Sequence, residues 1–331
     1  MPRSSATGYH RSMPSPPELT VVIAAFNEEA ALPLLHPRLR AVLDGLDLAT
    51  CVLYVDDGSR DRTWDVLGEL AASDPRVARL RLSRNFGKEA ALTAGLDRVR
   101  AGAALILDAD GQDPPELIPE FVARWHEGWD DVHGIRLERA GEGWFKRASA
   151  HAFYRVIGRL SRTPMPRDTG DFRLLSRRAL DGLAQLHERQ RFMKGLFAWV
   201  GYRQLSVPYH RAPRLAGRSQ FGFWKLWNFA LDGITGFSTV PLRVATYLGL
   251  ATAMMAILFG LMIIAKTLLW GDRVQGYPSL VALIVFLGGV QLIALGVIGE
   301  YLGRLYLEVK QRPLYLVDDW QPAAGASGDR T

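Results

Sequence analysis

Cysteine is nearly absent, because the 331-residue sequence contains only Cys51. This excludes a disulfide framework and fits a reducing compartment. Cys51 begins the apolar run CVLYV, so we interpret it as a buried structural thiol rather than a nucleophile. The seven histidines are scattered, with neither an H-E-x-x-H pattern nor a pair of cysteines beside them. A zinc site is therefore not expected.

Two common phosphate-binding signatures are also missing. No G-x-G-x-x-G follows the first apolar segment and no G-x-x-x-x-G-K-[ST] occurs, so we expect neither a dinucleotide-binding fold nor a P-loop. Residues 1–18 are polar and rich in proline and serine, and no apolar stretch follows their basic residues. We expect a disordered tail there and not a signal peptide.

Acidic residues are scarce in one block of a basic chain. The formal net charge is +6 and the pI is about 9.5. Between Trp144 and Ser219, sixteen Lys and Arg residues stand against four Asp and Glu residues, a net of +12. Such a block suggests a nucleic acid, an anionic membrane surface or a phosphorylated substrate as the partner.

Short apolar segments alternate with helix-like segments up to about residue 128. Strands are expected at 20–26, 51–59, 77–83 and 103–110, and helices at 28–46, 61–72, 88–100 and 114–128. This alternation predicts βαβ units in an α/β fold, with a mostly parallel sheet that is covered by helices on both faces.

Polar residues gather where these strands end. They are Asn27, Glu28, Asp56, Asp57, Ser59, Arg84, Asn85, Lys88, Asp108 and Asp110. Ligands of open α/β sheets bind beyond the carboxyl ends of the strands. We therefore predict a ligand site at this edge of the sheet.

The segment LILDADGQDPPE offers several oxygen ligands at one strand end. Asp108 and Asp110 are two residues apart, and with Gln112 they could bind one hard cation. Mg²⁺ or Mn²⁺ fits, since such ions take few protein carboxylates together with substrate phosphates. A D-x-D pattern alone is a weak signal. Asp113, which precedes two prolines, is interpreted as a helix N-cap.

Two long uncharged segments lie near the end of the chain. Residues 244–265 and 277–299 comprise 22 and 23 residues without a charge. As helices they would be about 33 and 35 Å long, enough to cross a hydrocarbon core of roughly 30 Å. The alternative is a helical hairpin buried in a soluble core. Basic residues on the flanks predict that both ends are cytoplasmic and the connecting loop is outside.

Two stretches before these segments are predicted to be amphipathic helices in the membrane interface. Residues 145–160 have an apolar face opposite a basic one, and residues 221–237 are rich in aromatic side chains. The alternative is that both are ordinary helices packed on the α/β domain. Their position just ahead of an apolar segment favours the membrane.

Six motifs in order carry a resemblance to a known family. They are AAFNEE, VDDGSRDRT, RNFGKEAAL, DADGQDPPE, DTGDFRLLSR and GRSQFG. From about Leu19 to about Pro313 the chain resembles glycosyltransferase family 2, and more narrowly the polyisoprenyl-phosphate glycosyltransferases, which include dolichol-phosphate mannose synthases and bactoprenol glucosyltransferases. One departure is that Ala24 and Phe26 replace the proline and tyrosine that usually precede Asn-Glu.

The resemblance implies a GT-A fold and a division of the chain. We expect a tail at 1–18, a GT-A catalytic domain at 19–219 and an interfacial helix at 220–242. Two transmembrane helices would follow within 243–300, and a cytoplasmic C-terminal tail at 301–331.

The resemblance also implies roles for the residues at the strand ends. The nucleotide would be bound by Ala25, Phe26, Asn27, Glu28, Asp56, Asp57, Lys88 and Asp108. The metal ion, Mg²⁺ or Mn²⁺, would be bound by Asp108, Asp110 and Gln112. Asp110 and Asp171 would be catalytic, Asp171 lying in DTGDFRLLSR together with Asp168.

The basic block would then bind an anionic acceptor. By the same resemblance, and because arginine suits bidentate phosphate contacts, the acceptor phosphate would meet Arg136, Arg147, Arg211, Arg214, Arg218 and Ser219. The alternative for any one of them is attraction to lipid headgroups alone. Since a phosphate monoester is largely ionised at pH 7, Asp171 has little need to act as a base.

The expected activity is that of a membrane-bound, inverting, metal-dependent glycosyltransferase. It would move a sugar from a nucleotide sugar, UDP-glucose in the leading case, to a polyprenyl phosphate such as undecaprenyl phosphate. Polyprenyl-phosphate mannose and N-acetylhexosamine synthases are the alternatives. The expected location is the inner (cytoplasmic) membrane, in multi-pass form with a cytoplasmic catalytic domain, and a homo-oligomer is compatible with a two-helix anchor.

Three rival classes fit the sequence less well. A processive polysaccharide synthase would need a longer membrane channel and a Q-x-x-R-W motif, which QLHERQRF does not supply. A non-enzymatic membrane scaffold would have no use for polar and charged residues at four strand ends. A nucleic-acid binder would account for the basic block but not for the apolar segments, so no nucleic acid is expected as a partner.

Overall fold

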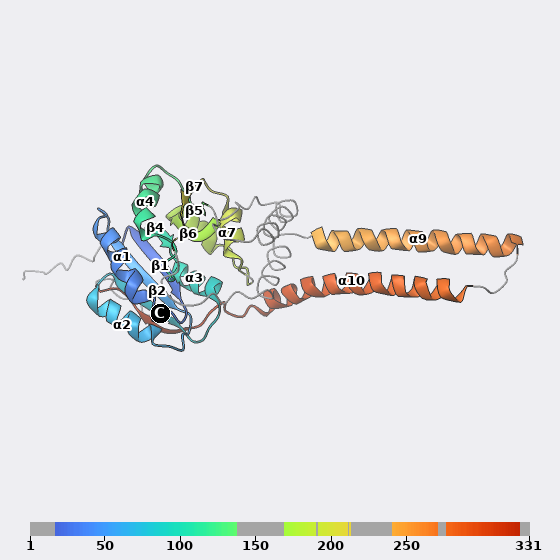
Figure 1. Cartoon of the computed structure of the whole chain (residues 1–331), viewed down its shortest axis with the longest axis horizontal. Coiled ribbons are helices and arrows are strands. Elements are labelled where there is room, and N and C mark those ends of the chain that lie inside the picture. Colours follow the sequence, from blue (N-terminus) through green and yellow to red (C-terminus); the bar gives the residue numbers. More distant parts are fainter. Residues whose placement is uncertain are drawn as a thin grey trace, which may run out of the picture.

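The computed structural model describes residues 17–137, 169–189, 191–210, 212, 240–270 and 276–324. Nearly all of the expected N-terminal tail and both expected interfacial helices lie outside these residues. The described residues form an α/β domain from which a pair of long helices extends (Figure 1).

A mixed sheet of eight strands forms the centre of the domain. Its parallel part consists of β1 (Leu19–Ala25), β2 (Thr50–Asp56), β3 (Val77–Leu82) and β4 (Ala103–Ile106). The complete order is β7-β5-β6-β4-β1-β2-β3-β8, with β1 paired in parallel to both β2 and β4. The predicted mostly parallel α/β fold is confirmed.

Four further strands extend the sheet on both sides. β6 (Thr169–Ser176) lies antiparallel to β4, and β5 (Asp131–Arg136) lies antiparallel to β6. At one edge β7 (Gln204–Tyr209) is parallel to β5. At the other edge β8 (Val317–Gln321) is antiparallel to β3.

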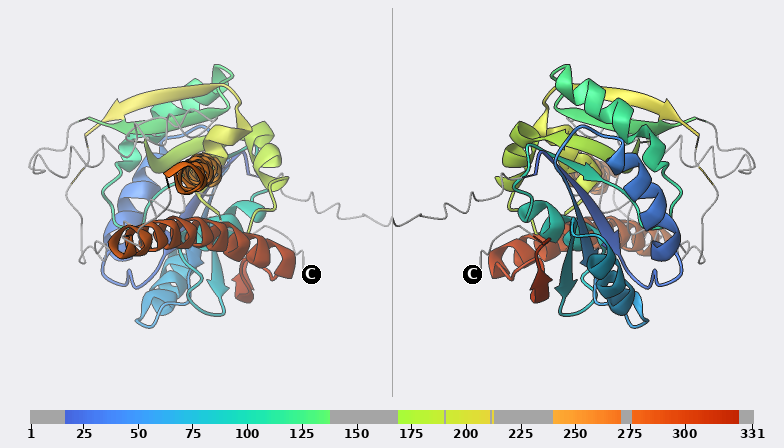
Figure 2. Two further views of the ribbon diagram at one scale, coloured as in Figure 1. Left: turned by 90° about the vertical axis from the view of Figure 1, so that its right-hand side faces the viewer. Right: turned by 90° about the vertical axis from the view of Figure 1, so that its left-hand side faces the viewer.

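Helices cover both faces of the sheet, as Figure 2 shows. α1 (Leu32–Asp44), α2 (Thr63–Ser73), the short 3-10 helix η1 (Pro115–Leu117) and α4 (Ile118–His126) cover one face. α3 (Lys88–Asp97), α6 (Arg177–Ala184) and α7 (Met193–Val200) cover the other. Alternate residues of β1 supply the two cores, because successive side chains of a strand point to opposite faces.

Close packing fixes the position of α3. A Cβ on Gly95 would lie 2.5 Å from Cγ1 of Val22 and 3.0 Å from Cγ2 of Val55, so only glycine lets the helix approach this close to the sheet. On the other face Phe121 is fully buried and stacks on Phe172 with ring centroids 4.6 Å apart. Truncating such a ring typically costs 3–5 kcal/mol, so these contacts hold β6 against α4.

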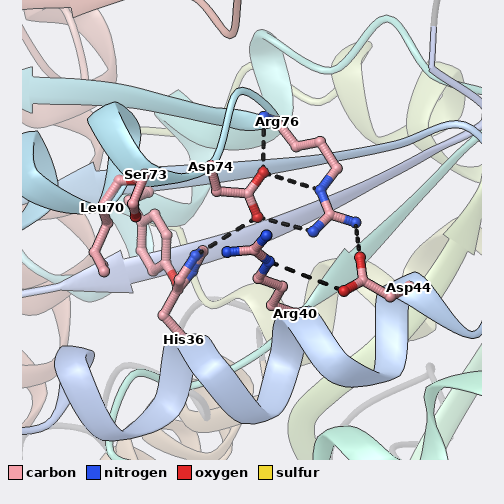
Figure 3. A network of polar contacts seen from close by, with 8 residues as sticks. His36, Arg40, Asp44, Leu70, Ser73, Asp74 and Arg76 are labelled. Carbon is pink, nitrogen blue, oxygen red and sulfur yellow. Dashed lines mark hydrogen bonds and ion pairs between the residues drawn. The ribbon is translucent and has the colours of Figure 1, made fainter.

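A buried polar network ties α1 to the sheet at the amino end of β3 (Figure 3). His36 Nδ1 lies 3.0 Å from the hydroxyl of Tyr54, and His36 Nε2 lies 3.7 Å from Asp74 Oδ2. Asp74 in turn accepts two hydrogen bonds from the guanidinium of Arg76, which also pairs with Asp44 at 2.9 Å. The network therefore stabilises the edge of the sheet opposite to the predicted ligand site.

Two long helices, α9 (Val240–Trp270) and α10 (Tyr277–Lys310), lie side by side and extend away from the sheet (Figure 1). Within them, Val244–Met262 and Phe286–Lys310 are long and apolar enough to cross a membrane, and almost none of their residues is buried. A hairpin in a soluble core would instead be mostly buried. α10 also continues to Lys310, past the end of the uncharged segment.

The chain returns to the sheet after α10. The hydroxyl of Tyr315 donates to Asp97 at 2.8 Å, the N–H of Ser83 donates to the carbonyl of Leu316 at 2.9 Å, and β8 then pairs with β3. We had expected only a tail in this region, so β8 is an element that the sequence analysis did not find.

Candidate active site

The loops that follow β1 and β2 are joined by hydrogen bonds. Asn27 has a φ of 56°, its N–H donates to Ser59 Oγ at 2.9 Å, and its Oδ1 accepts from the N–H of Arg60 at 2.9 Å. The N–H of Glu28 donates to Thr63 Oγ1 at 2.9 Å. Ala25 and Phe26 lie at the start of this loop, so four of the expected nucleotide-binding residues belong to one rigid turn.

Asp56, the last residue of β2, and Asp57, which follows it, have almost no exposure, at 0% and 2%. Asp56 Oδ1 accepts from the N–H of Ser59 at 3.0 Å, and its Oδ2 lies 3.4 Å from Nε of Arg81. Asp57 accepts from the N–H groups of Phe86 and Gly87 at 2.7 and 2.9 Å. Burial raises the pKa of Asp57, while these two donors oppose the rise.

Asp57 therefore determines the path of the turn that leads into α3. Gly58 makes this possible, since it has a φ of +64° and a Cβ there would lie 2.4 Å from the carbonyl carbon of Arg84. The loop after β2 thus packs on the loop after β3, which ends at Gly87. Lys88 follows directly, so this contact positions the first side chain of α3.

Lys88 joins two carboxylates from different strands. Its Nζ lies 2.6 Å from Oδ1 of Asp108, just beyond β4, and 2.5 Å from Oδ2 of Asp171 in β6. The side chains of Lys88, Asp108 and Asp171 are 43%, 17% and 13% exposed. Three of the residues that the sequence analysis selected are thus brought together at the carboxyl ends of the parallel strands, where the amino end of the antiparallel β6 also lies.

The charges in this group stabilise each other. Removal from water acts against the charge of Lys88, but Asp108 and Asp171 outweigh it and raise the pKa of the ammonium. Burial also acts against the ionised form of Asp171, yet Lys88, with Lys194 and Arg173, holds the pKa of this carboxyl well below its usual range. Asp171 Oδ1 is buried and accepts no hydrogen bond from any described residue.

The D-x-D segment supplies oxygens that suit a hard cation. Asp110 is 7% exposed, and its Oδ1 accepts from the N–H of Gln112 at 3.1 Å. Within the described ranges no group of three or more His, Cys, Asp or Glu residues could hold a metal ion. Asp108, Asp110 and Gln112 nevertheless fit a site in which substrate phosphates complete the coordination of Mg²⁺ or Mn²⁺.

The interpretation of Asp113 as an N-cap was wrong. η1 begins at Pro115 with Pro114 at its N-cap, and Asp113 Oδ1 instead accepts a hydrogen bond from the hydroxyl of Tyr209 at 2.5 Å. Tyr209 and Asp113 are both buried, and the hydroxyl of a buried tyrosine needs a hydrogen-bond acceptor. The carboxylate of Asp113 is that acceptor. The contact ties the D-x-D segment to the edge of the sheet.

The expected acceptor residues are mostly outside the described part of the chain. Arg136 ends β5 opposite Tyr209, but its side chain is not described. The other members, together with Asp168, lie wholly outside the described residues: Arg147, Arg211, Arg214, Arg218 and Ser219.

Part of the basic block is structural. Arg173 is 3% exposed, pairs with Asp131 at 3.0 Å, and lies over the ring of Phe197 at 4.0 Å. Arg177 pairs with Asp181 at 2.7 Å. The net charge of +12 therefore overstates the number of cations that are free to meet an anionic partner.

Sequence reasoning missed Glu89 and Lys194 beside this group. Glu89 directly follows Lys88, and Lys194 lies at the start of α7. The only signal for Glu89 was its place next to Lys88 in GKEAAL, and nothing in the sequence distinguished Lys194 from other basic residues.

Carboxylates at the ends of parallel strands, on an α/β sheet with a D-x-D segment beyond β4, define the GT-A class of glycosyltransferases. The family model described as "Glycosyl transferase family 2" matches residues 20–183, and the model described as "GtrB C-terminal hairpin" matches residues 240–305. This chain belongs to glycosyl transferase family 2.

Similar proteins include two that match nearly the whole chain. An uncharacterized glycosyltransferase of Synechocystis is 52% identical over 91% of this chain and 95% of its own. An SfII prophage-derived bactoprenol glucosyl transferase of Shigella flexneri is 46% identical over 91% of this chain and 97% of its own. A solved mannosyltransferase of Pyrobaculum calidifontis, 17% identical, has a TM-score of 0.41 over 90% of this chain and 77% of its own.

Proposed function

We propose that this glycosyltransferase transfers glucose from UDP-glucose to undecaprenyl phosphate at the cytoplasmic face of the inner membrane. The observation that carries the proposal is the group of Lys88, Asp108 and Asp171 at the edge of a family 2 sheet, in a chain that also has two exposed apolar helices. The relative from Shigella flexneri is named for bactoprenol and glucose, which supports both the acceptor and the sugar.

The proposed reaction is a single displacement. An oxygen of the acceptor phosphate forms a bond to the anomeric carbon, while the bond from that carbon to the diphosphate oxygen breaks. The nucleoside diphosphate leaves with the electron pair, and the anomeric configuration inverts. No proton need move in this step, since the acceptor phosphate is largely ionised near neutral pH.

Asp171 has an orienting role in this proposal. Because Lys88 keeps it ionised, its carboxylate is a weak base and is poorly suited to take a proton at neutral pH. Its ionised carboxylate serves instead to hold Lys88 in the site and to orient the acceptor or an arginine that binds it. The ammonium of Lys88 then provides a positive charge between β4 and β6, where the negative charge of the diphosphate develops.

Asp108, Asp110 and Gln112 would hold Mg²⁺ or Mn²⁺, which neutralises the leaving diphosphate when bound. The turn of Ala25, Phe26, Asn27 and Glu28, with Asp56 and Asp57, would shape the pocket for the nucleotide. The acceptor phosphate would meet arginines of the basic block, namely Arg136, Arg147, Arg211, Arg214 and Arg218, with Ser219.

A donor panel tests the proposal. Membranes that contain the protein are supplied with undecaprenyl phosphate, Mg²⁺ or Mn²⁺ and one radiolabelled donor, which is UDP-glucose, a UDP-N-acetylhexosamine or GDP-mannose. We expect label from UDP-glucose in the solvent-extractable lipid, and none with the Asp110→Ala variant. Transfer from another donor alone would replace the proposed sugar, and no labelled lipid from any donor would refute the lipid acceptor.

A further inference from the structure

The chain that follows α10 runs along the edge of the sheet, and we call residues 311–324 the C-terminal strap. Gln311 has a φ of 46° and ends α10 in the left-handed conformation that is common after helices. β8 then pairs with β3, and the N–H of Ala324 donates to the carbonyl of Pro75 at 2.9 Å. The C-terminal strap therefore covers the edge of β3, which would otherwise be open.

Two adjacent residues of the C-terminal strap hold the two ends of one segment. The hydroxyl of Tyr315 donates to Oδ2 of Asp97, the last residue of α3, at 2.8 Å. The carbonyl of Leu316 accepts from the N–H of Ser83, the first residue after β3, at 2.9 Å. Between these two contacts lie a short loop and α3, whose first residue is Lys88. The strap thus fixes both ends of the segment that carries Lys88.

Apolar packing keeps Tyr315 in this place. Tyr315 and Trp320 are partly buried against the same core to which α3 contributes, and the guanidinium of Arg98 lies 5.1 Å from the centre of the Trp320 ring. Burial, and next the hydrogen bond to Asp97, raise the pKa of Tyr315, so its hydroxyl remains a donor at neutral pH.

The other end of the C-terminal strap is joined to the end of α10. The guanidinium of Arg189, in the loop between α6 and α7, contacts the carbonyl of Arg312. Only two residues, one of them Pro313, separate this contact from Tyr315, and proline restricts the backbone of so short a link. A displacement of the end of α10 would therefore reach Tyr315.

The position of α3 makes the contact at its last residue important for its first. Gly95 lies against Val22 and Val55 of the sheet, close to Asp97. If α3 tilts about this contact as a rigid unit, Lys88 is about 10 Å away along the axis and Asp97 only about 3 Å. A small shift at Asp97 would thus move Lys88 several times further.

We propose that Tyr315 is a positioning residue, which holds the last residue of α3 and thereby keeps Lys88 between Asp108 and Asp171. The proposal rests on the proposed function for its meaning in catalysis. Tyr315 touches neither substrate in this account and acts through Lys88. The segment that follows the apolar helices is then part of the catalytic apparatus.

Variants of both partners separate positioning from packing. Tyr315→Phe removes the hydroxyl and keeps the ring. Asp97→Ala removes the acceptor, whereas Asp97→Asn keeps an oxygen that can accept the same hydrogen bond. Tyr202→Phe is the matched control, since Tyr202 is also partly buried against this core. For each full-length protein we would measure kcat, the KM for the sugar nucleotide and for polyprenyl phosphate, and the melting temperature.

We expect Tyr315→Phe and Asp97→Ala each to lower kcat by about 3- to 10-fold, because Asp97 is exposed and solvent weakens its hydrogen bond. Both KM values should stay within a few-fold of wild type. The double variant should be no slower than either single variant, since both remove the same contact. Asp97→Asn and Tyr202→Phe should keep nearly wild-type kcat. Unchanged kcat in Tyr315→Phe, or additive losses in the double variant, would overturn the proposal.

A second measurement does not depend on turnover. Trace acetylation followed by mass spectrometry reports the reactivity of the Lys88 amine, which its contacts to Asp108 and Asp171 should suppress in the wild type. We expect Lys88 to react several-fold faster in Tyr315→Phe and at the wild-type rate in Tyr202→Phe.

Wild-type labelling of Lys88 in Tyr315→Phe would overturn the proposal. If the melting temperature also fell, the hydrogen bond would only stabilise the fold. If the wild type transferred no sugar to lipid, the proposed function would fail, while the labelling would still decide whether Tyr315 positions Lys88.

Discussion

Replacing Lys88 by methionine tests the central charge arrangement of the site. The change keeps the length and apolar stem of the side chain and removes the ammonium that lies 2.6 Å from Asp108 and 2.5 Å from Asp171. Both carboxylates are largely shielded from water, so each loses a charged partner that solvent replaces only in part.

The size of the effect follows from these contacts. A hydrogen bond to a charged group contributes roughly 1.5–3 kcal/mol. The side chain of Lys88 is 43% exposed, so solvent screening weakens its contacts to Asp108 and Asp171. We therefore take their combined contribution to be about that of a single charged hydrogen bond. On the order of 1.5–3 kcal/mol in the activation barrier corresponds to a loss of about 10- to 100-fold in kcat.

The assay is the initial rate of sugar transfer to polyprenyl phosphate as a function of pH. Besides the lower kcat, the acid limb of the profile should move to higher pH, because Asp171 loses the cation that keeps its pKa low. Lys88→Arg should recover part of the activity. Arg40→Met is the control, since Arg40 lies on α1 and its side chain is 50% exposed.

Wild-type kcat in Lys88→Met would refute the reasoning, and so would a reduced rate with an unshifted acid limb. The second outcome would mean that Lys88 contributes without controlling the ionisation of Asp171. In that case the low pKa of Asp171 would have to come from Lys194 and Arg173.

Three further predictions concern metal, pH and acceptor. Asp110→Ala should abolish transfer while melting as the wild type does, and EDTA should inhibit the wild type until Mg²⁺ or Mn²⁺ is restored; a variant within a few-fold of wild-type activity would contradict the metal assignment. Burial lowers the pKa of His36, so the unfolded chain binds more protons below about pH 6.5 and stability should fall as the pH drops below that value. Chemical denaturation between pH 5 and 7 should show this slope in the wild type and less of it in His36→Gln. Arg136→Ala and Arg218→Ala should each raise the KM for polyprenyl phosphate by about 10- to 100-fold in detergent, with little change for the sugar nucleotide; an unchanged KM for the lipid would mean that these arginines contact only the membrane surface.

The first four strands could be predicted because each is a short apolar run that helix-like sequence follows. β6 was harder to recognise, since Arg173 places a charge inside a buried strand. That charge is compensated by Asp131 and by the ring of Phe197, and neither partner can be identified from local sequence. β7 contains Pro208, which is tolerated because β7 is an edge strand.

The candidate site was predictable to the extent that chain direction places residues at strand ends. Asp108 and Asp110 follow β4 and so had to lie at the ligand edge. Asp57 follows β2 in the same way, but its contacts to the backbone of Phe86 and Gly87 depend on how two loops meet. Glu89 and Lys194 lie on the same face of the sheet only because α3 and α7 both pack there, which no sequence pattern encodes.

Hydrogen bonds join the end of α10 to the α/β domain. The N–H of Arg189, in the loop between α6 and α7, donates to Glu308 of α10 at 2.7 Å, and the guanidinium of Arg189 also contacts the carbonyl of Arg312. This loop leads directly into α7, which packs with α3 on the same face of the sheet. The end of α10 is thus hydrogen-bonded to the loop that leads into α7, on the face of the sheet that also carries α3. The end of α10 can therefore set the position of the active site relative to the bilayer, which an acceptor confined to that surface requires.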